Sequence, residues 1–74
     1  MKDKSNNHQS FRISENIKKI RQEKGISQDR LSKIADLSLN TVVNVESGEN
    51  PNPTIETLLK IADALGVNIE KLVR

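Results

Sequence analysis

Three glycines and two prolines divide this 74-residue chain into segments that are too short for long helices or broad sheets. Gly25, Gly48 and Gly66 each follow an apolar pattern, and glycine takes the left-handed conformation that ends a helix at little cost. Pro51 and Pro53 cannot continue a helix, so they predict an extended loop. The length allows one domain with one small core. This spacing predicts a series of short helices joined by tight connections.

Apolar residues recur with the 3.6-residue period of an α-helix, and no segment alternates with the period of a β-strand. We predict an all-α domain of five short helices over 11–74, preceded by a flexible polar tail over 1–10. The first helix is expected over about 14–24. The residues expected to cap the five helices are Ser14, Ser27, Ser38, Thr54 and Asn68. In the first four helices, the residues expected to face the protein core are Ile13, Ile17, Ile20, Leu31, Ile34, Ala35, Val42, Val45, Ile55, Leu58, Leu59, Ala62 and Leu65.

Composition excludes several classes of function. The chain has no cysteine, which rules out disulfides and thiolate metal sites, and Phe11 is its one aromatic residue, which argues against stacking of single-stranded bases. No apolar run approaches the ~20 residues that cross a membrane. The one histidine lies in the polar tail, and no phosphate loop or metal motif occurs. We therefore expect no enzyme, cofactor, metal or membrane span.

Charge is distributed unevenly along the chain. Residues 1–35 carry nine Lys or Arg and four Asp or Glu, whereas residues 36–74 carry three and six, for a net charge of +2. An asymmetric field of this kind suits a polyanion on one side of the molecule. The alternative is that the first helix has an ordinary solvated basic face.

The second and third predicted helices are separated only by Asp36, Leu37 and Ser38, which is the geometry of a helix-turn-helix. In that motif one helix enters a DNA major groove ~12 Å wide while its partner braces it against the backbone. Val42 and Val45 would dock the reading helix. The candidate base-reading residues are Leu39, Asn40, Thr41, Val43 and Asn44. The alternative is that Asn40 and Thr41 only support the helix start and Val43 is core.

Asparagine and threonine suit base reading. An Asn amide both donates and accepts, so it can pair bidentately with adenine, and aliphatic groups can contact the thymine methyl. We therefore expect a preference for A·T base steps. Ser27 and Gln28 lie where the second helix begins, beside unpaired N–H groups and a positive dipole end, so a DNA phosphate is a natural partner for them. The alternative for Gln28 is an ordinary solvated position.

Three motifs occur at fixed distances: S-Q-x-x-L-S-x-x-A from Ser27, S-x-x-T-V from Ser38, and E-x-G from Glu46. With the segment from Pro53 to Val67, they resemble the Cro/repressor-type helix-turn-helix family, also called the XRE family, which has the lambda-repressor-like fold. The resemblance runs from about Ile13 to Val73. One departure is Asp36, which stands where many members carry a glycine. Another is the absence of Lys or Arg between Lys33 and Lys60.

The resemblance implies a role for several residues. Gln28 would contact a phosphate, and the base-reading positions named above would lie at the base edges. Asn50 and Asn52, in the loop after the third helix, would contact phosphates. Arg21 and Glu46 would form a salt bridge that sets the angle of the reading helix and leaves Arg21 partly free for a phosphate.

These observations together predict a sequence-specific binder of double-stranded DNA, a transcriptional repressor of prokaryotic or phage type. It would act in the cytoplasm, associated with the nucleoid, as a homodimer on a two-fold operator with half-sites about 34 Å apart. Ile69, Leu72 and Val73 near the C-terminus would supply the dimer contact or, alternatively, close the core. A protein-interaction or antitoxin-like module with the same fold is the alternative function.

Overall fold

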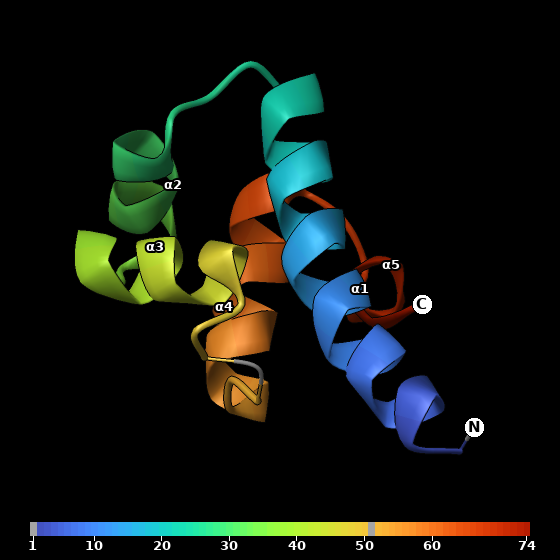
Figure 1. Cartoon of the computed structure of the whole chain (residues 1–74). Helices are drawn as coiled ribbons and strands as arrows, with labels where there is room; N and C mark the ends of the chain where they lie inside the picture. The colour runs from blue at the N-terminus through green and yellow to red at the C-terminus, as the bar shows by residue number, and fades with distance from the viewer. Residues whose placement is uncertain (1, 51) are drawn as a thin grey trace.

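The structure is a computed structural model that describes the backbone of residues 2–50 and 52–74, and the side chains of 12–50 and 52–74. Within these residues every regular element is helical, which confirms the predicted fold class. The helices are α1 (Lys2–Glu23), α2 (Gln28–Ala35), α3 (Leu39–Ser47), α4 (Ile55–Leu65) and α5 (Ile69–Val73) (Figure 1). No helix among the described residues combines the length and the apolar character that a membrane crossing requires.

α1 is the helix that joins the helix-turn-helix to the C-terminal helices. It contacts α3 on one side and α5 on the other, while α4 packs on α2 and α5 (Figure 1). The centre of the core is formed by side chains with no exposed surface, from all five helices: Ile17, Leu31, Val42, Val45, Ile61 and Leu72. Burying one such aliphatic side chain contributes about 1.5–3 kcal/mol. The core therefore fixes where α3 lies relative to α1 and α2.

Three of the side chains that we expected in the core are exposed. Ile34 is 49% exposed, Leu59 51% and Ile55 64%. In α4 the stripe that faces the core includes Ile61, which is fully buried and which the predicted pattern omitted. The apolar residues of this helix cover more than one face, so their period alone does not show which face is inside. Leu72 has no exposed surface and closes the core, which is the second of the two roles that we considered for it.

The predicted start of the first helix at Ser14 is wrong. α1 begins at Lys2, and Ser14 lies inside it. Instead of capping, its buried hydroxyl donates a hydrogen bond of 2.7 Å to the carbonyl oxygen of Val45 in α3. The side chains of residues 1–11 lie outside the described part of the chain, so the predicted tail over 1–10 stays a prediction.

Three of the other four predicted caps are confirmed. Ser27, Ser38 and Thr54 each have extended backbone and accept a hydrogen bond from the backbone N–H three residues later. Asn68 occupies the N-cap position of α5 but makes no capping hydrogen bond with its side chain. A contact with α1 holds α5 in place instead: the side-chain amide of Asn16 donates a hydrogen bond of 3.0 Å to the carbonyl oxygen of Leu72.

The turn between α2 and α3 is made by a left-handed Asp36, with φ 59° and ψ 47°. This is the glycine position of the family, and an aspartate side chain tolerates the conformation better than most others. The turn is closed by a hydrogen bond of 2.8 Å from the Leu37 N–H to the Ser32 carbonyl oxygen. The left-handed turn is therefore kept here without glycine.

We expect the strain at Asp36 to be measurable. D36G should raise the free energy of unfolding by about 0.5 kcal/mol, since glycine relieves the positive φ but makes the unfolded chain more flexible. D36A should lower it by about 1 kcal/mol, because alanine has no polar group to offset the strain. Urea denaturation followed by circular dichroism measures both. A D36A variant as stable as D36G would contradict this account of the turn.

Candidate DNA interface

One face of α3 is buried and the opposite face is open to solvent. Val42 and Val45 have no exposed surface and dock the helix on the core. On the outer face, Leu39 is 43% exposed and Val43 is 36% exposed, one helical turn apart, and Asn40 is exposed beside them. The described structure thus places Val43 outside the core, against the alternative we considered. The outer face has the length and shape of a reading helix, and none of its side chains is charged.

Two of the predicted base-reading residues are less open than the other three. Thr41 is half-buried, and its hydroxyl lies 2.8 Å from the Ser38 hydroxyl while its N–H donates to the same oxygen. Thr41 therefore supports the helix start, as the alternative held. Asn44 is half-buried. Sequence reasoning missed Ser47, which is exposed one turn beyond Val43 on the same helix and signalled only by that spacing.

A buried ion pair joins α1 to α3. Arg21 Nε donates to Glu46 Oε2 at 2.6 Å and Arg21 Nη2 donates to Glu46 Oε1 at 3.1 Å, so the contact is bidentate. The side chains are 11% and 0% exposed. Arg21 Nη1 also donates to the carbonyl oxygen of Ile26 at 2.7 Å. The salt bridge that the family resemblance implied is present, and it ties the end of α3 to the end of α1.

Gln28 extends this network to α2. Its Nε2 donates to Glu46 Oε1 at 3.0 Å, which orients the side-chain amide. One N–H of that amide group remains for a phosphate oxygen, and the bond to Glu46 keeps the amide from turning its oxygen toward an anion. Arg21 is placed differently: the residue is 9% exposed and each of its three guanidinium nitrogens already donates inside the protein. The structure gives its predicted phosphate contact no support.

The remaining predicted phosphate contacts lie at the two ends of the motif. Ser27 is exposed, and its hydroxyl accepts the N–H of Arg30 at 3.0 Å, which leaves its own hydrogen for another acceptor. Asn50 and Asn52 are exposed in the loop after α3, and the Asn50 N–H donates to the Asn44 carbonyl oxygen at 3.1 Å. Both side chains are thus available next to the end of the reading helix.

The arrangement is a scaffold for recognition. Among the described residues no group of three His, Cys, Asp or Glu side chains could hold a metal ion. What the fold does provide is a short helix docked on its inner face, open on its outer face and braced by α1 and α2. This geometry defines the class of the helix-turn-helix domains that read DNA.

Comparisons with known proteins identify the family. Residues 17–72 match the family model described as helix-turn-helix. An uncharacterized HTH-type transcriptional regulator of Sinorhizobium fredii is 34% identical over 61 residues, which cover 82% of this chain and 78% of that protein. The immunity repressor protein of Bacillus phage phi105 is 33% identical over 61 residues, covering 82% of this chain and 42% of the repressor. No solved structure matches.

The chain therefore belongs to the Cro/repressor-type, or XRE-type, helix-turn-helix family of DNA-binding transcriptional regulators. The aligned part corresponds to less than half of the phage repressor, so that protein's other activities are not carried over.

The buried and exposed ion pairs should differ sharply in their effect on stability. E46A leaves the Arg21 guanidinium buried without its partner, and we expect it to lower the free energy of unfolding by about 3–5 kcal/mol. K33A removes the exposed pair of Lys33 with Asp29, whose side chains are 71% and 59% exposed, and should cost less than about 1 kcal/mol. Urea denaturation of both variants tests the comparison. Equal losses would contradict a structural role for Glu46.

Proposed function

We propose that this protein binds a specific duplex operator in the cytoplasm and represses transcription from it. The observation that carries the proposal is the outer face of α3, which is uncharged, exposed and held at a fixed angle by the Arg21–Glu46–Gln28 network. A face of this kind discriminates bases by hydrogen bonds and methyl contacts. The phosphate contacts come from the start of α2 and from the loop after α3. One of the relatives is named a repressor, which supports repression over activation of transcription.

The structure favours some of the predicted readers over others. Asn40 is the polar group best placed for a bidentate bond to adenine, and Leu39 and Val43 offer the methyl groups that contact thymine. Asn44 and Thr41 would contribute at the edges, Thr41 chiefly by holding the helix start. Selection of binding sites from random duplex DNA tests the proposal, because it reveals a half-site and any two-fold symmetry together. Absence of any selected site at low salt would contradict it.

We expect different signatures from a base contact and a phosphate contact. N40A should change the selected sequence and cost about 1–3 kcal/mol on the best site. Q28A should weaken binding to all duplexes by a similar factor, since its remaining N–H faces the backbone. Fluorescence anisotropy on the selected duplex and on a scrambled duplex measures both effects. A uniform loss in N40A would show that Asn40 does not read a base.

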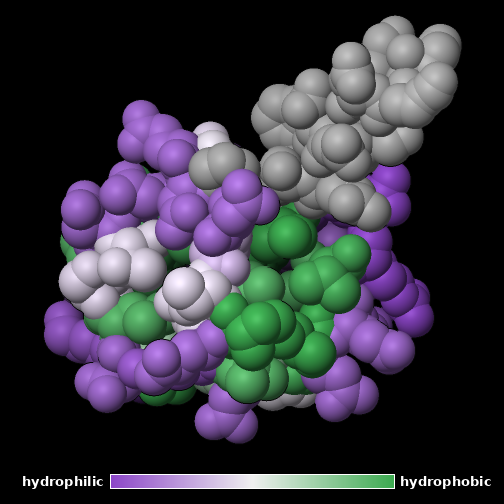
Figure 2. Space-filling view, turned by 90° about the horizontal axis from the view of Figure 1, so that it is seen from below, coloured by the Kyte–Doolittle hydropathy of each residue, from purple (hydrophilic) through white to green (hydrophobic). Residues whose placement is uncertain are grey.

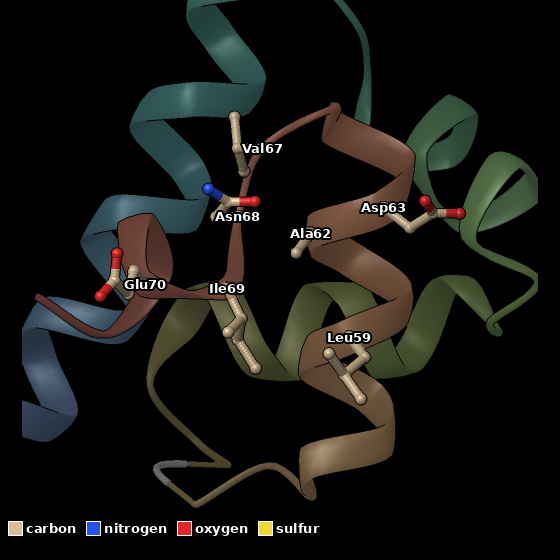
Figure 3. Close-up of a pocket in the computed structure, with 7 residues that line it drawn as sticks. All are labelled: Leu59, Ala62, Asp63, Val67, Asn68, Ile69 and Glu70. Atoms are coloured by element: carbon tan, nitrogen blue, oxygen red, sulfur yellow. The ribbon is translucent and has the colours of Figure 1, made fainter.

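The homodimer in this proposal would form through a surface between α4 and α5. A groove of about 470 Å³ runs between these helices, with Leu59 and Ala62 on one side and Ile69 on the other (Figure 3). Beside it, Val73 is 45% exposed and Ile55 64% exposed. The space-filling view from below shows apolar residues gathered in one area at this end of the molecule (Figure 2).

This α4–α5 surface suits a second copy of the chain. It lies away from α3, because α3 packs on α1 and α2, whereas α5 packs on α1 and α4 (Figure 1). A dimer formed there would leave both reading helices free, as a two-fold operator requires. An exposed apolar area of this kind is a usual sign of an interaction site.

We expect L59E to convert the dimer to a monomer, since it places a charge in the centre of the α4–α5 surface. I34E is the matched control, because Ile34 is 49% exposed but lies on α2. Sedimentation equilibrium at micromolar concentration distinguishes the two. If the wild type is a monomer and still binds a two-fold site, the dimer forms only on the DNA. If the wild type is a dimer and L59E has the same mass, this surface does not form the dimer.

A further inference from the structure

The reading helix and the loop after it lack the positive charge that a DNA backbone attracts. No Lys or Arg lies between Lys33 and Lys60, while Glu49 lies two residues beyond the end of α3. The C-terminal end of a helix also carries a partial negative charge. Phosphates near this end of α3 would therefore be repelled unless a neighbouring element supplies a cation.

Two of the cations in or beside the motif are already engaged. Arg21 is buried and bonded to Glu46, and Lys33 forms an ion pair of 2.8 Å with Asp29. Each of these side chains is held by an acidic partner within the protein. Arg30 is exposed on α2 and forms no ion pair among the described residues. The last turn of α3, however, is bonded to α1 through Ser14 and Arg21.

Lys18 emerges from α1 at its junction with α3. Ser14 and Arg21, which both bond to α3, flank it on the helix. With 3.6 residues per turn, the direction of Lys18 differs by about 40° from that of Ser14 and about 60° from that of Arg21. Yet Lys18 is exposed, whereas the other two are buried. Its side chain therefore leaves the helix at the rim of the junction with α3.

The rim lies beside the last turn of α3. Ile17 points into the core, and the direction of Lys18 is rotated from it by about 100°, past the contacts with α3. The Val45 carbonyl that Ser14 binds belongs to the last turn of α3, directly before the loop of Asn50. Lys19, by contrast, is rotated by about 160° from Ile17 and faces solvent on the far side of α1.

We propose that Lys18 contacts a phosphate of the bound duplex and supplies the cation that α3 and its following loop lack. The proposal rests on DNA binding as proposed above. The contact neutralises backbone charge beside the C-terminal end of α3 and carries no base preference. Lys18 thus adds α1 to the DNA interface, beyond the helix-turn-helix itself.

Two single-lysine variants test this on the selected duplex. K18A should weaken binding about fivefold to tenfold at 0.1 M salt, equally for the selected and a scrambled duplex, and reduce the slope of log K against log[salt] by about 1. K19A removes the same charge from the adjacent residue and should change the slope little. K18R should restore it. Circular dichroism and urea denaturation check that all three variants fold like the wild type.

The outcomes separate this inference from the proposed function. If K18A and K19A lose affinity and slope equally, the effect is one of net charge and the assignment of Lys18 is overturned. The same holds if neither variant differs from a wild type that binds its selected site. A wild type that binds no duplex at low salt would overturn both the function and the contact.

Discussion

The orientation of the reading helix depends on one buried ion pair, that of Arg21 and Glu46. Removing two charges from water costs several kcal/mol each, so such a pair is tolerated only when its hydrogen bonds are satisfied. Here the carboxylate accepts from Arg21 twice and from Gln28 once, and the guanidinium also bonds to Ile26. An apolar cluster could supply equal stability, but it would not orient the Gln28 amide.

This arrangement separates base reading from charge. The outer face of α3 holds aliphatic and amide groups, whose contacts with bases depend on geometry and little on salt. Most of the positive charges lie on α1 and α2, from where they would act on the DNA backbone. Since Ser14 and Arg21 also hold α3, the same helix would set the angle of the reader and provide its backbone cation. In the proposed function, specificity and general affinity would therefore be carried by different elements of the domain.

Much of the fold followed from local chemistry, because caps and stops act over a few residues. Ser27, Ser38 and Thr54 begin helices, and Gly48 and Gly66 end them, as predicted. Ser14 was misjudged because a serine inside a helix has the same local signal as a cap, and only the position of Val45 shows its role. The bond of Gln28 to Glu46 spans two helices, so no spacing in the chain could have indicated it.

The errors in the predicted core of α4 share a physical cause. Helical periodicity identifies apolar positions, but it does not show whether they face the protein's own core or a partner. Ile55 and Leu59 fit the period and yet are exposed, and Leu59 lines the same groove as Ile69. Exposing aliphatic surface to water costs about 25 cal/mol per Å², a cost that a second copy would remove. The misassigned residues of α4 are therefore those that best mark where the proposed dimer forms.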